Sequence, residues 1–86
     1  MEVVISKLFF EQFEKCPPEF QKDFRKIYQQ LKIVDSPTEI KAIQKYSSNK
    51  KYFKLTIQSS KISIKVDKGL LIIACFLYNQ YFVKQK

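Results

Sequence analysis

Hydrophobic positions in the first half of the chain follow a helical period. From Pro18 onward, apolar side chains recur at the spacing of an amphipathic helix that packs on a core. Pro18 suits the first turn of such a helix, where a missing N–H costs nothing. The apolar stripe consists of Phe20, Phe24, Ile27, Tyr28 and Leu31, and the opposite face carries Lys22, Arg25, Lys26, Gln29 and Lys32. We therefore predict a helix that is apolar inside and basic outside.

Beyond the polar, turn-rich segment Tyr46–Lys51, the hydrophobic period changes to that of β-strands. Apolar residues alternate with polar or basic ones around Phe53–Ile57 and again around Ile62–Val66, so each strand has one core face and one basic face. Leu70–Leu77 is continuously apolar, which is typical of a central strand covered on both faces. The predicted turns are Gln58-Ser59-Ser60 and Asp67-Lys68-Gly69, where Gly69 suits a positive φ. The pattern predicts an antiparallel meander.

Three shorter signals complete the expected fold. The β-branched cluster in Glu2–Ser6 favours a first strand, and the aromatic residues in Leu8–Phe13 favour a helical turn or two. Ser36-Pro37-Thr38-Glu39 has the cap, proline and glutamate of a helix start, which predicts a brief helix through Ile40 and Ile43. We expect one α+β domain over residues 1–86. It has an N-terminal strand and two to three helices packed on an antiparallel sheet with a three-stranded C-terminal meander.

Charge and residue types restrict the function. Sixteen Lys and Arg against eight Asp and Glu give a net charge of +8, which indicates an anionic partner such as RNA. The chain has no histidine and two cysteines, so we expect no zinc site, no Cys/His nucleophile and no cofactor. We expect Cys75 to be buried in its apolar run and Cys16 to lie near a surface turn before Pro17.

No segment predicts export or membrane insertion. Met1–Phe10 lacks the basic head and apolar stretch of a signal peptide. The run Leu70–Tyr78 is less than half as long as a membrane-spanning helix requires. We therefore expect a cytoplasmic protein without a membrane partner.

Element order and short motifs resemble the RelE/ParE superfamily of toxins from type II toxin–antitoxin systems. In many of these toxins the second strand has an aromatic, an arginine and a hydrophobic residue, then a glycine-containing turn and a second arginine. The last strand often ends in hydrophobics, histidine and arginine, with a tyrosine a few residues on. The matching segments here are Tyr52–Ile57, Ser60–Ile62 and Phe76–Val83, and Cys16-Pro17-Pro18 leading into the long helix also corresponds. The resemblance implies the RelE/ParE-like fold.

Several family positions are altered in this chain. Lys54 and Lys61 stand where the family has strand arginines, and Gln58 stands at the turn glycine. Asn79 occupies the terminal arginine position, and the final tyrosine aligns nearer Val83. A lysine keeps the charge of arginine but loses the bidentate fork that grips a phosphate, so these changes bear directly on activity.

The resemblance implies a ribosome-dependent mRNA endonuclease, or mRNA interferase, that inhibits translation. In this reaction the RNA 2′-hydroxyl attacks the adjacent phosphate, which requires a base, an acid for the leaving group and cations for the phosphorane charge. Lys54 and Lys61 would stabilise the phosphate, and Asn79 would orient a phosphate oxygen. Tyr81, with Tyr78 as the second choice, would stack on a base or donate a proton. A general base requires a lysine whose pKa is lowered by its basic surroundings. Sequence-independent RNA contacts would come from Arg25, Lys26, Lys50, Lys51 and Lys65.

Other interpretations fit the same sequence. A non-catalytic ParE-like or inactive homologue would act by binding gyrase or an antitoxin, and the missing arginines favour it. A small basic RNA-binding protein unrelated to toxins is supported by the charge alone, and an RNA recognition motif lacks its Gly/aromatic signature here. The toxin interpretation implies an acidic antitoxin from an adjacent gene, covering the basic face with a helix or strand, together with the ribosome and mRNA as targets.

Overall fold

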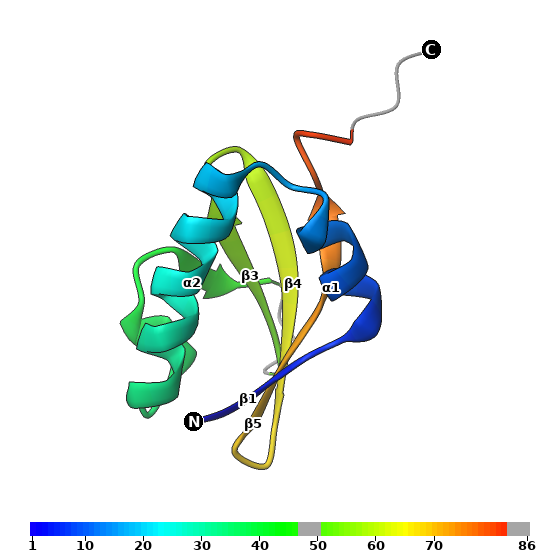
Figure 1. Ribbon diagram of the computed structural model, residues 1–86. Helices are drawn as coiled ribbons and strands as arrows, with labels where there is room; N and C mark the ends of the chain where they lie inside the picture. The colour runs from blue at the N-terminus through cyan, green and yellow to red at the C-terminus, as the bar shows by residue number, and fades with distance from the viewer. Residues whose placement is uncertain (47–50, 83–86) are drawn as a thin grey trace.

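Two α-helices and a five-stranded sheet make up the fold, as the computed structural model shows for residues 1–46 and 51–82 (Figure 1). The predicted α+β class and the number of helices are confirmed. The elements in chain order are β1 (Glu2–Ile5), α1 (Lys7–Glu14), α2 (Pro18–Ile33), the 3₁₀ helix η1 (Pro37–Glu39), β2 (Ile43–Lys45), β3 (Tyr52–Ile57), β4 (Ser60–Asp67) and β5 (Leu70–Tyr78).

The strands lie in the order β1-β5-β4-β3-β2. β3, β4 and β5 form the predicted antiparallel meander. β1 instead runs parallel to β5, with Glu2 opposite Leu70 and Ile5 opposite Ile73. The sheet is therefore mixed, and the expectation of an antiparallel sheet is wrong only for the pairing of β1 with β5. Parallel neighbours need a long connection, and here the whole α1-to-β4 segment separates β1 from β5.

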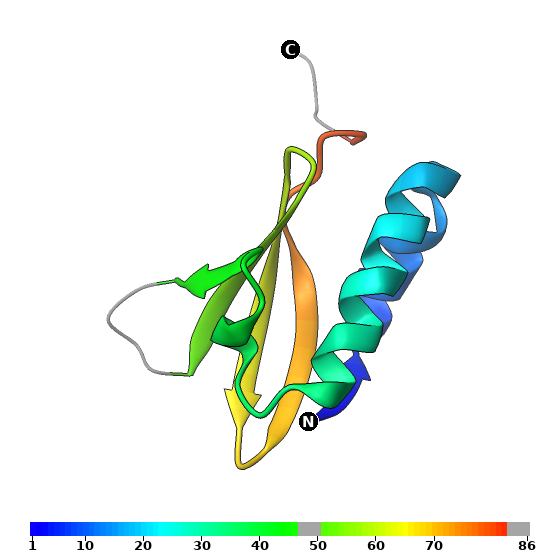
Figure 2. The same cartoon turned by 90° about the vertical axis from the view of Figure 1, so that its left-hand side faces the viewer.

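Both α-helices lie on one side of the sheet (Figure 2). In α2, Phe20, Phe24 and Leu31 of the predicted stripe are buried, and the basic residues on its opposite side are exposed. α1 begins at an N-cap, because the Ser6 hydroxyl oxygen accepts a hydrogen bond from the Phe9 N–H at 3.1 Å. Phe9 stacks on Phe76 of β5 with ring centroids 4.8 Å apart. The core thus lies between the helices and one face of the sheet.

The segment after α2 differs from its prediction. Its helix is limited to η1, since Ile40 already has extended backbone angles (φ −96°, ψ 123°). Ile43 begins β2 and pairs with Leu55 of β3. Both isoleucines are buried, so the core receives the same side chains by a different backbone path. A three-residue strand is too short to show an alternating pattern, which is why the sequence did not reveal it.

β5 has one covered face, so the expectation of burial on both faces is wrong. Leu71 and Ile73 point into the core and are fully buried. Ile72 lies opposite Lys65 of β4 and Val4 of β1, and it is half-buried. No described element crosses this second face. The apolar character of β5 there leaves hydrophobic surface beside basic side chains.

The two β-turns match the positions predicted for them. Gly69 has a φ of 80° and Lys68 a φ of 51°, which gives the β4–β5 turn two consecutive left-handed residues. In the β3–β4 turn Gln58 has a φ of 56°, and Ser60 already belongs to β4.

Candidate nucleic-acid interface

The sheet face turned away from α1 and α2, called the open face here, carries the candidate RNA-binding side chains. Residues opposite one another on paired strands share a face of the sheet. The strand register places three rows on the open face, namely Gln44–Lys54–Ser63–Cys75, Tyr52–Lys65–Ile72 and Thr56–Lys61–Tyr78. The alternation in the sequence had placed Tyr52, Lys54 and Thr56 together, but the neighbours of each row depend on register.

Three lysines are neighbours on the open face. Lys54 pairs with Ser63, and Lys61 and Lys65 stand two residues to either side of Ser63 on β4. Diagonal neighbours of this kind have Cα atoms about 7–8 Å apart, within reach of flexible lysine side chains. The three side chains are neither buried nor fully exposed. Two of the predicted site residues, Lys54 and Lys61, therefore lie together with Lys65, which was assigned to general RNA contacts.

The lysines differ in their present partners. The Lys61 ammonium donates a hydrogen bond to the Thr56 hydroxyl at 3.4 Å. The Lys65 ammonium lies 5.8 Å from the centre of the Tyr52 ring, a cation–π contact that sequence reasoning missed. The Lys54 ammonium has no hydrogen bond or ion pair with any residue that the structure describes, although its backbone is paired with β2 and β4. Its ammonium is thus the one most available to a phosphate oxygen.

Asn79 and Tyr81 point away from these lysines. The Asn79 amide donates toward the Cys16 sulfur at 3.8 Å. The Tyr81 ring packs edge-on against Phe20 of α2, with centroids 5.8 Å apart, and its hydroxyl donates a hydrogen bond to the Gln58 side-chain oxygen. Both side chains therefore lie on the helical side of the sheet. Tyr78, the second choice, lies opposite Lys61 on the open face and is 45% exposed.

The segment that follows β5 is tied to the β3–β4 turn. The Gln80 side-chain oxygen accepts a hydrogen bond from the Ser59 N–H at 2.7 Å, and the Gln80 N–H donates to the Ser60 hydroxyl at 3.1 Å. Gln58 also donates from its side-chain amide to Asp23 of α2 at 3.4 Å. These contacts hold Asn79 and Tyr81 in their positions. Val83, aligned with the family's final tyrosine, lies outside the described residues.

Two of the other predicted RNA contacts lie away from the open face. Arg25 and Lys26 are exposed on α2, across the sheet from the three lysines. Lys51 forms an ion pair with Asp67 at 3.8 Å, and the two side chains are 59% and 41% exposed, so the pair contributes little to stability. Lys50 lies outside the described residues.

Each cysteine lies in the kind of environment that was expected for the other. Cys16 is 4% exposed and packs in the core, whereas Cys75 is half-buried on the open face. Burial raises the pKa of the Cys16 thiol above its ordinary value, and the hydrogen bond from Asn79 acts in the opposite direction. The Cys16 thiol is therefore protonated at neutral pH and is a poor nucleophile.

Neither a metal site nor a membrane span is found in the described part of the chain. No group of three or more His, Cys, Asp or Glu side chains there is placed to hold a metal ion. None of the helices combines the length and apolar character that crossing a bilayer requires.

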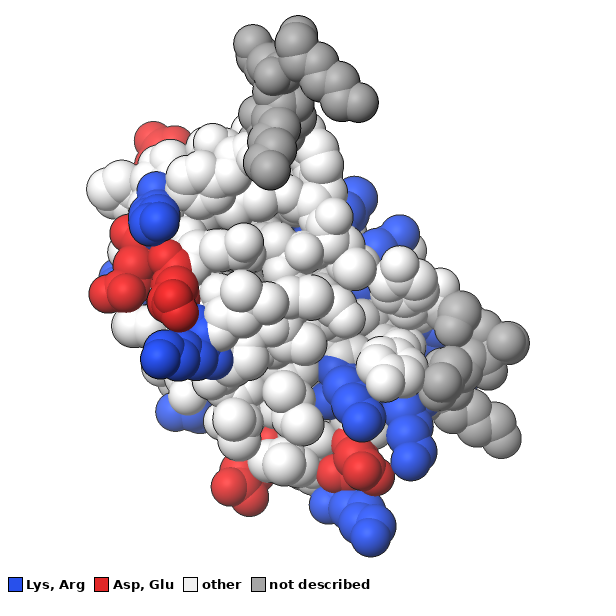
Figure 3. Space-filling view, turned by 90° about the vertical axis from the view of Figure 1, so that its right-hand side faces the viewer, with Lys and Arg blue, Asp and Glu red and all other residues white. Residues whose placement is uncertain are grey.

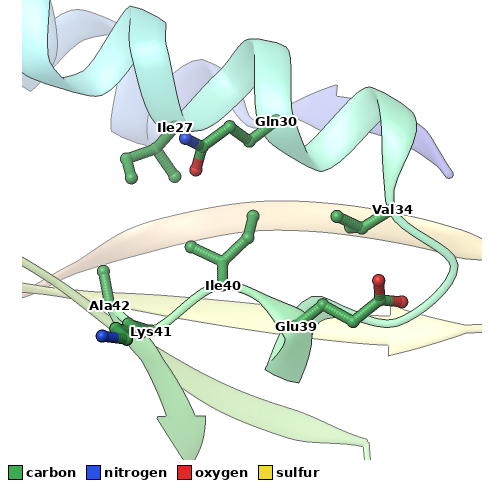
Figure 4. Close-up of a pocket in the computed structure, with 7 residues that line it drawn as sticks. All are labelled: Ile27, Gln30, Val34, Glu39, Ile40, Lys41 and Ala42. Atoms are coloured by element: carbon green, nitrogen blue, oxygen red, sulfur yellow. The ribbon is translucent and has the colours of Figure 1, made fainter.

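A groove of about 470 Å³ separates α2 from the η1–β2 segment (Figure 4). Ile27 and Val34 line one side of it, with Ile40 and Ala42 opposite. The Glu39 carboxylate at its end accepts hydrogen bonds from the backbone N–H groups of Asp35 and Ser36 at 3.1 and 3.0 Å. The groove is mainly apolar and lacks a cluster of reactive side chains, so it is a weaker candidate than the open face.

Similar folds occur among toxin–antitoxin proteins. A chain of the RelB-RelE antitoxin–toxin complex from Methanococcus jannaschii matches with a TM-score of 0.75 and 20% sequence identity, over 87% of this chain and 88% of that chain. The YoeB dimer from Staphylococcus aureus matches with a TM-score of 0.50 and 18% identity, over 92% and 97%. No family model and no curated protein sequence matches the chain. The fold is RelE-like.

Proposed function

We propose that this protein is the toxin of a type II toxin–antitoxin system that binds and cleaves mRNA on the ribosome through its open face. The observation that carries the proposal is that Lys54, Lys61 and Lys65 are neighbours on the uncovered face of a RelE-like sheet. Positive charge combined with flanking aromatic rings is the usual composition of surfaces that bind single-stranded RNA. Tyr52 and Tyr78 provide those rings at the two ends of the lysine cluster.

The proposed reaction uses the substrate's own nucleophile. The RNA 2′-hydroxyl oxygen attacks the adjacent phosphorus, the bond to the 5′-oxygen breaks, and a 2′,3′-cyclic phosphate and a 5′-hydroxyl result. Lys54 and Lys61 stabilise the phosphorane charge, and one ammonium donates the proton that the leaving oxygen takes. The proton of the 2′-hydroxyl passes to solvent. The cytoplasm, where ribosomes work, is the compartment this function requires.

The positions of Asn79, Tyr81 and Tyr78 in the structure change the roles that we propose for them. Asn79 and Tyr81 face the helices, so we assign them the task of holding the chain after β5 against the β3–β4 turn. Tyr78 takes over the stacking role because it lies beside Lys61. Lys65 joins the phosphate contacts of the open face, and Arg25 and Lys26 contact ribosomal RNA on the other side of the molecule.

An antitoxin is the second proposed partner. One similar structure is a complex of an antitoxin with a toxin, and the net charge of +8 suits an acidic protein. Covering the lysines of the open face would neutralise the charge that RNA requires.

A purely protein-binding homologue is the alternative function. The specific observation in its favour is that Asn79 and Tyr81 are turned away from the lysines, which leaves the open face without a third polar catalytic group from the tail. Such a protein would bind gyrase or an antitoxin and would leave mRNA intact.

Primer extension on translating ribosomes with a defined mRNA tests the enzymatic proposal. We expect cleavage by the wild-type protein and its loss, by about 100-fold or more, in the Lys54→Ala/Lys61→Ala variant, because such electrostatic contributions are worth orders of magnitude in rate. The matched control is Lys15→Ala/Lys22→Ala, which removes the same charge at two exposed residues that have no proposed RNA contact. No cleavage by the wild type at concentrations that saturate ribosome binding would refute the enzyme and favour the protein-binding alternative.

A further inference from the structure

The three lysines of the open face form a triangle of positive charge. Lys54 is a diagonal neighbour of both Lys61 and Lys65, because all three surround Ser63 in the register of β3 and β4. Lys61 and Lys65 are four residues apart on β4, which corresponds to about 13 Å along an extended strand. Along the strand direction Lys54 therefore lies between the other two, and its flexible side chain can reach toward either.

The rows of the open face that hold this triangle contain no carboxylate among the described residues. On β4 the nearest carboxylate is that of Asp67, two residues beyond Lys65, and it forms an ion pair with Lys51. The Ser63 hydroxyl has no hydrogen bond to another described residue, so it can donate one to an anion. The triangle thus offers three ammonium groups and a hydroxyl donor within a small area.

The spacing of negative charge in the ligand decides how well it fills this area. An RNA strand carries a single charge on each nucleotide, so it meets the lysines one phosphate at a time. The triphosphate of a free nucleotide places several negative charges in one short chain. Three ammonium groups within reach of one another match this second arrangement closely.

Tyr78 provides a surface on which a base can stack beside the triangle. It lies opposite Lys61 in the register of β4 and β5 and is 45% exposed. A base stacked on its ring would direct the attached phosphates toward Lys61 and Lys54. Tyr52, at the other end of the triangle, already has the Lys65 ammonium 5.8 Å from the centre of its ring.

We propose that the open face also binds free nucleoside triphosphates, with the base on Tyr78 and the phosphates on Lys54 and Lys61, and that these nucleotides compete with RNA. The ligand is the metal-free triphosphate, because Mg²⁺ cancels part of its charge. The described residues also include no group of three or more His, Cys, Asp or Glu side chains placed to hold such an ion. The inference deepens the proposed function by naming a regulator of the same surface, and only the competition with RNA rests on that function.

Isothermal titration calorimetry with adenosine triphosphate (ATP), inorganic tripolyphosphate and adenosine separates the contributions of phosphate and base. We expect ATP to bind about tenfold more tightly than tripolyphosphate, since stacking of one base on an aromatic ring has this order of effect. Adenosine should show no measurable binding. Magnesium chloride should weaken ATP binding severalfold relative to sodium chloride at the same ionic strength. Tripolyphosphate that binds as tightly as ATP, or ATP binding that Mg²⁺ strengthens, would overturn the inference.

A lysine substitution locates the phosphates. Lys54→Ala should weaken the binding of both ATP and tripolyphosphate by about tenfold, because it removes a charged hydrogen-bond donor. The matched control is Lys22→Ala, which removes the same charge from an exposed residue of α2. Circular dichroism of each variant establishes that it is folded. Equal losses in the two variants would mean that the phosphates respond to the net charge of +8 alone, and the site would not exist.

A tyrosine substitution locates the base. Tyr78→Ala should lower the affinity for ATP to that for tripolyphosphate and leave the affinity for tripolyphosphate unchanged. Tyr52→Ala is the matched control, and it should preserve the preference for ATP, because the Tyr52 ring is engaged by Lys65. A preference for ATP that survives Tyr78→Ala would contradict the placement of the base.

Competition is measured with a labelled single-stranded RNA whose riboses carry 2′-O-methyl groups, so that it has no 2′-hydroxyl nucleophile and stays intact. ATP should displace this RNA at concentrations close to its own dissociation constant. RNA that remains bound at saturating ATP would refute the competition. Failure of this inference and failure of the proposed function are distinguishable, because the titrations use neither ribosomes nor cleavage. Absence of mRNA cleavage leaves nucleotide binding standing, and absence of nucleotide binding leaves the cleavage result standing.

Discussion

Gln58 holds a backbone conformation that glycine adopts at the least cost, with a φ of 56°. A non-glycine residue there costs roughly 1–2 kcal/mol. Its side chain offsets part of that cost, because it accepts a hydrogen bond from the Tyr81 hydroxyl and donates one to Asp23. Gln58 therefore has a structural role, since it connects the turn, α2 and the chain after β5.

Separate substitutions of Tyr81 and Tyr78 test the division of roles between them. Tyr81→Phe removes the hydroxyl that donates a hydrogen bond to Gln58 and keeps the ring packed against Phe20. We therefore expect the free energy of unfolding to fall by about 1 kcal/mol. RNA affinity should not change. Tyr78→Ala should weaken RNA binding by about 1–3 kcal/mol through lost stacking, with little effect on stability. Urea unfolding and fluorescence anisotropy with a single-stranded RNA measure the two quantities. Weaker RNA binding by Tyr81→Phe alone would restore Tyr81 as the site residue.

At the scale of the elements, the β4–β5 turn depends on two left-handed residues in succession, Lys68 and Gly69. A Cβ added at Gly69 would meet no atom within 4 Å, so a substitution there has no steric clash and changes only the backbone preference. We expect Gly69→Ala to lower the free energy of unfolding by about 1 kcal/mol. Lys68→Asn is the control, because asparagine tolerates this conformation and should preserve or raise stability. Chemical denaturation measures both, and an unchanged Gly69→Ala variant would contradict the explanation.

Helices and strands that are long enough to show a hydrophobic period were predictable from the sequence. The stripe from Phe20 to Leu31 defined α2, and the alternation in β3 and β4 placed Lys54 and Lys61 on the same open face. The pairing of Ile43 with Leu55 was not predictable, because the three residues of β2 are too few to show a hydrophobic period. β2 forms because it pairs with β3. The sequence also did not show on which side of the sheet Tyr81 lies. This side is decided after β5 ends, by contacts with Phe20 and Gln58 that are distant in sequence.

At the scale of the whole molecule, two groups of basic residues lie on separate surfaces. The exposed side of α2 carries Lys22, Arg25 and Lys26, and the open face carries the three lysines around Ser63. The sheet and core separate the two surfaces, and the side of the molecule in Figure 3 has an uncharged stretch with charged residues at its borders. One strand of RNA on the open face therefore contacts only part of the net charge.

The dependence of RNA affinity on salt measures how many of these charges take part. For single-stranded nucleic acid the logarithm of the association constant falls with the logarithm of salt concentration by about 0.7 for each phosphate neutralised. Contacts from Lys54, Lys61 and Lys65 should thus give a slope of about −2 in anisotropy titrations of a short RNA over a sodium chloride series. Lys54→Ala should make the slope less steep by about 0.7, and Lys26→Ala should leave it unchanged. A slope that responds equally to both substitutions would mean that the RNA also contacts α2. The proposal that the RNA binds on the open face would then be wrong.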